Sequence, residues 1–75
     1  MRPNVVEALS NLAKGLALLG RDEKAVEQFD CVLAIRPDDP ATLVDRGRVL
    51  ARLARHAEAL ASYERAIAIH PNRLP

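Results

Sequence analysis

Residues 58–71 have the sequence EALASYERAIAIHP, and residues 24–37, which lie 34 residues earlier, have the sequence KAVEQFDCVLAIRP. Both segments contain an alanine, an aromatic residue four positions later and a closing proline at the same spacing. Their apolar residues follow the 3.6-residue period of a helix, and a proline after such a pattern ends the helix. The two segments therefore predict a repeated helical unit.

The 34-residue period extends over most of the chain. When residues 6–39 are laid over residues 40–73, nine positions are identical: Leu9/Leu43, Leu16/Leu50, Ala17/Ala51, Leu19/Leu53, Arg21/Arg55, Ala25/Ala59, Ala34/Ala68, Ile35/Ile69 and Pro37/Pro71. We expect one unit at 6–39 and a second at 40–73, because a fixed period of this length is typical of repeat architectures. Residues 1–5 are then the tail of a preceding repeat or the start of the chain, and residues 74–75 are a tail. This arrangement favours a piece of a longer array over a natural two-repeat protein.

Each unit is expected to contain two helices. Gly20 follows the first apolar stripe, as a glycine at a helix C-terminus does. Asp39 and Pro40 suit the N-cap and the first position of a helix. No segment alternates with the period of two that a strand requires. We predict an all-α fold of two stacked helix–turn–helix hairpins, an α-solenoid fragment with helices at about 5–19, 22–36, 40–53 and 56–69.

These features resemble the tetratricopeptide repeat, a 34-residue unit that pairs an A helix with a B helix. The matching positions are Leu9, Leu12, Ala13, Leu16, Gly20, Ala25, Phe29 and Pro37 in the first unit, and Leu43, Gly47, Leu50, Ala59, Tyr63, Ala66 and Pro71 in the second. Three positions depart from the family pattern: Val32, Arg46 and Ala54 stand where alanine, leucine and glycine are usual. The small residues Ala13, Gly47, Ala25 and Ala59 are expected where the paired helices approach most closely.

The resemblance implies a protein-binding scaffold whose A helices line a concave groove for a peptide or a partner helix. It places the following residues on that groove: Glu7, Ser10, Asn11, Lys14, Leu18, Ala41, Val44, Asp45, Arg48 and Arg52. Lys14, Arg48 and Arg52 suit an acidic ligand, although an ordinary solvated face has the same composition. The family's way of gripping a terminal carboxylate is not supported, because Ser10 and Asp45 stand at two of the positions it uses.

Two other functions are compatible with the same sequence. The chain could be a docking or regulatory segment of a larger enzyme such as a transferase. It could also be a self-associating structural element, because the open side of a terminal repeat leaves apolar residues uncovered. That face is expected to contain Val49, Leu53, Leu60, Tyr63 and Ile67.

Composition argues against several other classes of protein. Eleven Lys and Arg residues against ten Asp and Glu give a net charge of +1, without the basic excess of a nucleic-acid-binding domain. No apolar run approaches the length of a membrane span. His56, His70 and Cys31 have no metal-ligand or catalytic spacing, so we expect no cofactor, no metal and no enzymatic activity. A single cysteine is compatible with the cytoplasm.

Overall fold

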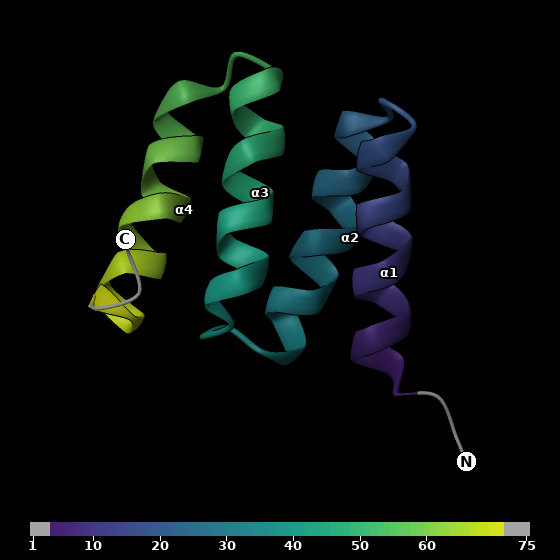
Figure 1. Ribbon diagram of the computed structural model, residues 1–75, viewed down its shortest axis with the longest axis horizontal. Coiled ribbons are helices and arrows are strands. Elements are labelled where there is room, and N and C mark those ends of the chain that lie inside the picture. The colour runs from purple at the N-terminus through teal and green to yellow at the C-terminus, as the bar shows by residue number, and fades with distance from the viewer. Residues whose placement is uncertain (1–3, 72–75) are drawn as a thin grey trace.

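The computed structural model describes residues 4–71. Within that range every regular element is an α-helix, apart from a single 3₁₀ residue, Pro71. The four helices are α1 (Val5–Leu18), α2 (Asp22–Ile35), α3 (Pro40–Arg52) and α4 (His56–Ile69). They form two antiparallel hairpins, α1–α2 and α3–α4, which stack side by side (Figure 1). The predicted all-α fold is confirmed, and each helix ends within one residue of its expected bounds. Of the tails expected at residues 1–5 and 74–75, residues 1–3 and 74–75 lie outside the described residues, whereas Asn4 caps α1 and Val5 begins it.

The turn inside each hairpin has the same hydrogen-bond pattern. After α1, the amides of Gly20 and Arg21 donate to the carbonyls of Ala17 and Leu16, at 3.1 and 2.8 Å. This is the Schellman arrangement, which requires a left-handed residue, and Gly20 has a φ of +77°.

In the second hairpin Ala54 occupies the same left-handed position, with a φ of +61°. The amides of Ala54 and Arg55 donate to Ala51 and Leu50 at 3.0 and 2.9 Å. An L-residue with a β-carbon is less stable in this conformation by about 1–2 kcal/mol. The second turn therefore keeps the geometry of the first at a conformational cost.

The segment between the hairpins ends α2 and begins α3. Pro40 is the first residue of α3, as expected, and Asp39 lies at the N-cap. The Asp39 carboxylate does not bond to a backbone amide, however, and instead accepts a hydrogen bond of 2.6 Å from the Thr42 hydroxyl. At the start of α1, by contrast, the side chain of Asn4 accepts from the amide of Val6 at 2.9 Å, which is the usual capping bond.

The core lies where α2 and α3 pack together and receives side chains from all four helices: Ala13, Ala25, Val26, Phe29, Val49, Leu50 and Ala59. Ala13, Ala25, Phe29 and Leu50 are almost completely buried. A β-carbon at Gly47 would lie 2.7 Å from Cε1 and 2.9 Å from Cζ of Tyr63, which is too close. The absence of a side chain at Gly47 therefore makes room for the tyrosine ring. Phe29 and Tyr63 are both more than half buried, as predicted.

Candidate functional site

A shallow hollow of about 390 Å³ lies between α1 and α3, with a side chain of α2 at its base. We call it the α1–α3 groove, and it is lined by Lys14, Ala17, Leu18, Phe29, Asp45, Arg48, Val49 and Arg52. Leu18 is 89% exposed, which is unusual for a leucine on a helix that packs against two others. The groove therefore combines an exposed apolar side chain with charged groups from both A helices.

The three cations of the groove differ in their availability. The guanidinium of Arg52 donates to both carboxylate oxygens of Asp22, at 2.5 and 3.2 Å, and to the carbonyl of Ala17 at 3.0 Å. Hydrogen bonding to Arg52 lowers the pKa of Asp22 below its ordinary value, and the same bonds raise the pKa of Arg52. Arg52 is therefore held in an ion pair that links α2 to α3.

Lys14 and Arg48 are the more accessible cations. The side chain of Arg48 is 70% exposed, and its one ion pair among the described residues is a long contact of 3.8 Å with Asp45. Lys14 is exposed on α1 and forms no ion pair within residues 4–71. These two side chains can rearrange to meet an anionic group without breaking a strong internal contact.

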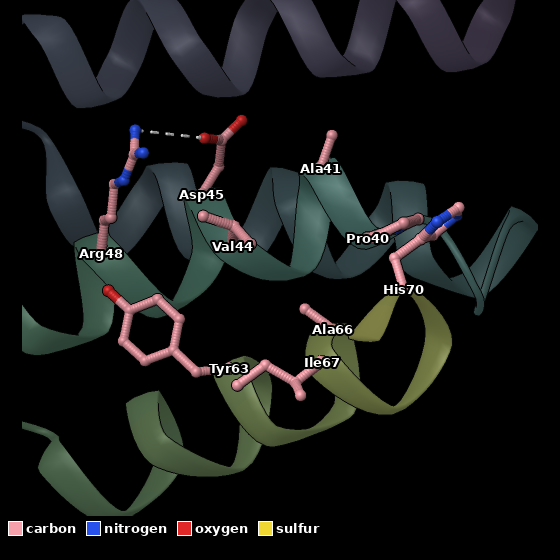
Figure 2. Close-up of a pocket in the computed structure, with 9 residues that line it drawn as sticks. All are labelled: Pro40, Ala41, Val44, Asp45, Arg48, Tyr63, Ala66, Ile67 and His70. Atoms are coloured by element: carbon pink, nitrogen blue, oxygen red, sulfur yellow. Dashed lines mark ion pairs between the residues drawn. The ribbon is translucent and has the colours of Figure 1, made fainter. Parts of the chain in front are cut away.

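A second hollow of about 700 Å³ lies between α3 and α4, and we call it the α3–α4 hollow. Figure 2 shows Asp45, Arg48 and Tyr63 toward one end and Pro40 and His70 at the other. Its remaining lining is apolar or small: Ala41, Val44, Ala66 and Ile67. This hollow is larger than the α1–α3 groove and has a more apolar lining.

The structure divides the residues that were expected on the groove into three sets. Lys14, Leu18, Asp45, Arg48 and Arg52 line the α1–α3 groove, whereas Ala41 and Val44 line the α3–α4 hollow, which also includes Asp45 and Arg48. Glu7, Ser10 and Asn11 lie on α1 and line neither hollow. The sequence reasoning missed Pro40, Ala66 and His70. The period gave no signal for them, because their equivalents in the first unit, Val6, Val32 and Arg36, were not expected on the groove either.

The residues expected on the self-association face also differ in their exposure. Leu60 and Ile67 are 58% and 43% exposed, and Tyr63 is partly buried beside them. The assignment of Val49 to an exposed face was wrong, because Val49 is 2% exposed and belongs to the core. Leu53 is partly buried and packs against the same core. The uncovered apolar surface of the second hairpin is therefore on α4.

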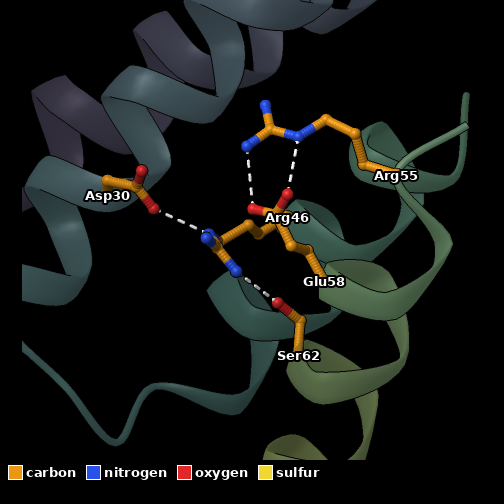
Figure 3. A network of polar contacts seen from close by, with 5 residues as sticks. All are labelled: Asp30, Arg46, Arg55, Glu58 and Ser62. Carbon is orange, nitrogen blue, oxygen red and sulfur yellow. Dashed lines mark hydrogen bonds and ion pairs between the residues drawn. The ribbon is translucent and has the colours of Figure 1, made fainter. Parts of the chain in front are cut away.

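A polar network joins three of the helices (Figure 3). Arg46 of α3 donates to Asp30 of α2 and to Ser62 of α4, both at 2.6 Å. Ser62 is almost fully buried, so its hydroxyl gains a partner that it would otherwise lack. Beside this network, the guanidinium of Arg55 donates two hydrogen bonds, of 2.7 and 2.8 Å, to the carboxylate of Glu58. These bonds lower the pKa of Glu58. Arg46 thus links the two hairpins from the position where a leucine is usual in the resembled family.

Comparison with known protein families gives a match for the second hairpin. The model of the tetratricopeptide repeat matches residues 40–73. Residues 40–73 are a tetratricopeptide repeat. The matched range begins with the first residue of α3 and includes all of α4, so it coincides with the second hairpin. No curated protein matches the chain. Repeats of this family generally act as protein–protein interaction modules rather than as catalysts.

The described residues were expected to hold no metal site, no catalytic group and no membrane span, and three observations bear on these points. The described residues contain no group of three or more His, Cys, Asp and Glu side chains able to hold a metal ion. His56 and His70 are exposed at the two ends of α4, and Cys31 is an exposed free thiol on α2. Within residues 4–71 no helix has the length and apolar character needed to cross a membrane.

Proposed function

We propose that the two hairpins act together as a non-catalytic scaffold that binds an acidic peptide, or the acidic face of a partner helix, in the α1–α3 groove. The observation that carries this proposal is the meeting of Lys14 and Leu18 from α1 with Arg48 from α3 around one hollow. A cation on either side of an exposed leucine suits a ligand that combines carboxylates with an apolar side chain.

The internal contacts of the groove support different roles for its cations. Arg52 already has Asp22 and the Ala17 carbonyl as partners, so its role is to hold α2 and α3 in position. Arg48 would exchange its 3.8 Å contact with Asp45 for a closer ligand carboxylate. Asp45 beside it would repel a ligand with too many negative charges, which favours a mixed acidic and apolar sequence.

The first hairpin is included in this proposal because three of the eight residues that line the groove, Lys14, Ala17 and Leu18, belong to α1. Residues 6–39 share the period and the turn geometry of the matched repeat, and we propose that they are a divergent copy of it. The exposed thiol of Cys31 suits a reducing compartment such as the cytoplasm, where an unpaired cysteine stays reduced.

Charge reversal tests the groove. A library of fluorescent peptides that mix Asp and Glu with leucine is screened against the chain by anisotropy, and the tightest binder is titrated against variants. Lys14→Glu and Arg48→Glu should each weaken binding about tenfold, which corresponds to about 1.4 kcal/mol. Lys24→Glu is the matched control, because Lys24 is an exposed lysine of α2 that lines neither hollow. Equal affinity for all three variants would contradict the proposal.

A further inference from the structure

The α3–α4 hollow corresponds to a place that is filled in the first hairpin. Its lining residues Tyr63 and Ala66 are equivalent to Phe29 and Val32 of α2. Phe29 and Val32 have 1% or less of their surface exposed. Val26 of α2 is 5% exposed, whereas its equivalent Leu60 is 58% exposed. Helix α3 packs against α2, and no described helix packs against the outer side of α4. The α3–α4 hollow and the exposed side of α4 therefore have the shape of a seat for one more A helix.

The face of α3 that makes the internal contact has a counterpart on α1. Thr42, Arg46 and Val49 lie on one side of α3: Thr42 and Val49 are buried, and Arg46 bonds to α2. The equivalent residues on α1 are Ala8, Leu12 and Gly15, and the same stripe continues to Val5 and Leu19. These five positions are uncharged and helically spaced.

Within residues 4–71, no helix covers the stripe on α1. Val5, Leu12 and Leu19 are each at least half exposed, and a β-carbon at Gly15 would meet nothing within 4 Å. Leu12 and Leu19 would be costly to expose in water if no partner covered them. The chain therefore presents an A-helix face at one end and an open seat for an A-helix face at the other.

We propose that the α1 stripe of one copy docks on the α3–α4 hollow and the outer side of α4 of a second copy, in the register that α3 uses on α2. The two halves of this interface lie on opposite ends of the same chain, so the contact is heterologous and repeats from copy to copy. It goes beyond the proposed binding function and does not depend on it. Asp45 and Arg48 line both hollows, but the α1 stripe and the outer side of α4 are not part of the α1–α3 groove.

Both ion pairs between α2 and α3 are missing in this arrangement. Leu18 and His56 hold the positions equivalent to Arg52 and Asp22. Arg46 meets Asp30 at 2.6 Å between α3 and α2, but Leu12 and Glu64 hold the equivalent positions on α1 and α4. Leu12 of one copy would face the exposed Glu64 of the next, without a charge to pair with it. The contact between copies is therefore weaker than the contact between the hairpins, and it forms reversibly.

Sedimentation equilibrium from about 10 μM to about 1 mM, a range that detects weak complexes, tests the proposal. The average mass of the unmodified chain should rise with concentration. Leu12→Glu and Ile67→Glu should each weaken association at least tenfold, because each buries an unpaired carboxylate in the interface. Ala61→Glu is the matched control and should leave association unchanged, since Ala61 is exposed and its equivalent Glu27 is an exposed glutamate. Circular dichroism checks that every variant keeps its helix content.

Mixing the two disabled variants distinguishes the geometries. The Leu12→Glu chain keeps its seat on α4, and the Ile67→Glu chain keeps its α1 stripe, so an equimolar mixture should form a complex with the mass of two chains. A closed dimer through two α4 faces predicts instead that Leu12→Glu alone associates as the unmodified chain does, and that adding Ile67→Glu yields no complex containing both variants. Either of those results would overturn the proposal, as would a chain that is monomeric at every concentration.

A charge of the opposite sign tests the register. Leu12→Arg places a guanidinium where Arg46 lies in the internal contact, facing Glu64 instead of Asp30. This variant should associate at least as tightly as the unmodified chain at low salt. A loss as large as that of Leu12→Glu would show that α1 does not dock in the register proposed.

Discussion

The two hairpins have the same period and the same turns, yet they bury equivalent side chains to different extents. Val26 and Phe29 of α2 are enclosed because α1 and α3 pack on either side of them. Leu60 is exposed and Tyr63 is only partly buried on α4, which has α3 on one side and none of the described helices on the other. The difference shows that burial in a repeat depends on its neighbours as much as on its own residues.

Truncating the aromatic residue of each B helix should give the largest difference in stability between the two hairpins. Phe29→Ala should lower the free energy of unfolding by about 3–5 kcal/mol, because it empties the centre of the core. Tyr63→Ala should cost about half as much, since part of its ring already contacts water. Urea unfolding followed by circular dichroism measures both. Equal losses would contradict the claim that α2 is enclosed on both sides whereas α4 is not.

The small residues at the start of each B helix should tolerate no enlargement. Ala25→Leu and Ala59→Leu are expected to lower stability by about 1–3 kcal/mol or more, because both alanines are buried where helices pack closely. Arg65→Ala, at an exposed position of α4, should change it by less than about 0.5 kcal/mol. Thermal midpoints that do not separate the two classes would refute the packing argument.

The two left-handed turn positions can be compared by exchanging glycine and alanine at each of them. Gly20→Ala should destabilise the chain by roughly 1 kcal/mol, because it places a β-carbon at a φ of +77°. Ala54→Gly should stabilise it by about 0.5–1 kcal/mol, since relief at a φ of +61° exceeds the extra entropy of glycine in the unfolded chain. Thermal denaturation of the two variants measures the effect. Shifts of the same sign would be inconsistent with this account.

The smallest expected effect is the response to acid. The pKa of Asp22 is lowered by Arg52, so its contribution is complete above its ordinary pKa of about 3.9 and is lost as the pH falls through the lower folded value. The pKa of Glu58 is lowered by Arg55 and behaves in the same way. The melting temperature should therefore be flat near neutral pH and decline below about pH 4.

Neutral variants distinguish the contributions of Asp22 and Glu58 to the loss of stability in acid. Asp22→Asn should flatten the acid decline more than Glu58→Gln does, because Asp22 joins two hairpins and Glu58 bonds within one turn of its own helix. A decline that is equally steep in both variants and in the unmodified chain would exclude these pairs as its cause.

The sequence predicted the helices well because prolines and turn residues mark their ends. The 34-residue period and the positions of Gly20, Pro37 and Pro40 were enough to place the helices within a residue. The left-handed Ala54 was harder to interpret, since alanine is a strong helix former and its conformation follows from the turn around it.

The candidate site was harder to predict than the fold. Apolar periodicity identifies a helix face but not its neighbour, and for that reason Val49 was placed on the surface although it lies in the core. Pro40, Ala66 and His70 come together only when α3 and α4 pair, so no local pattern indicated the hollow that they line. The role of Arg46 depends on Asp30 and Ser62, which lie sixteen residues away on either side.

Amide hydrogen exchange, measured residue by residue on the dilute chain, tests the central difference between the hairpins most directly. Exchange reports the free energy of local opening, which is smallest where a helix has few neighbours. Amides of α2, which packs against α1 and α3, should exchange more slowly than the equivalent amides of α4, which packs against α3 alone among the described helices. Protection of α4 equal to or greater than that of α2 would contradict the account.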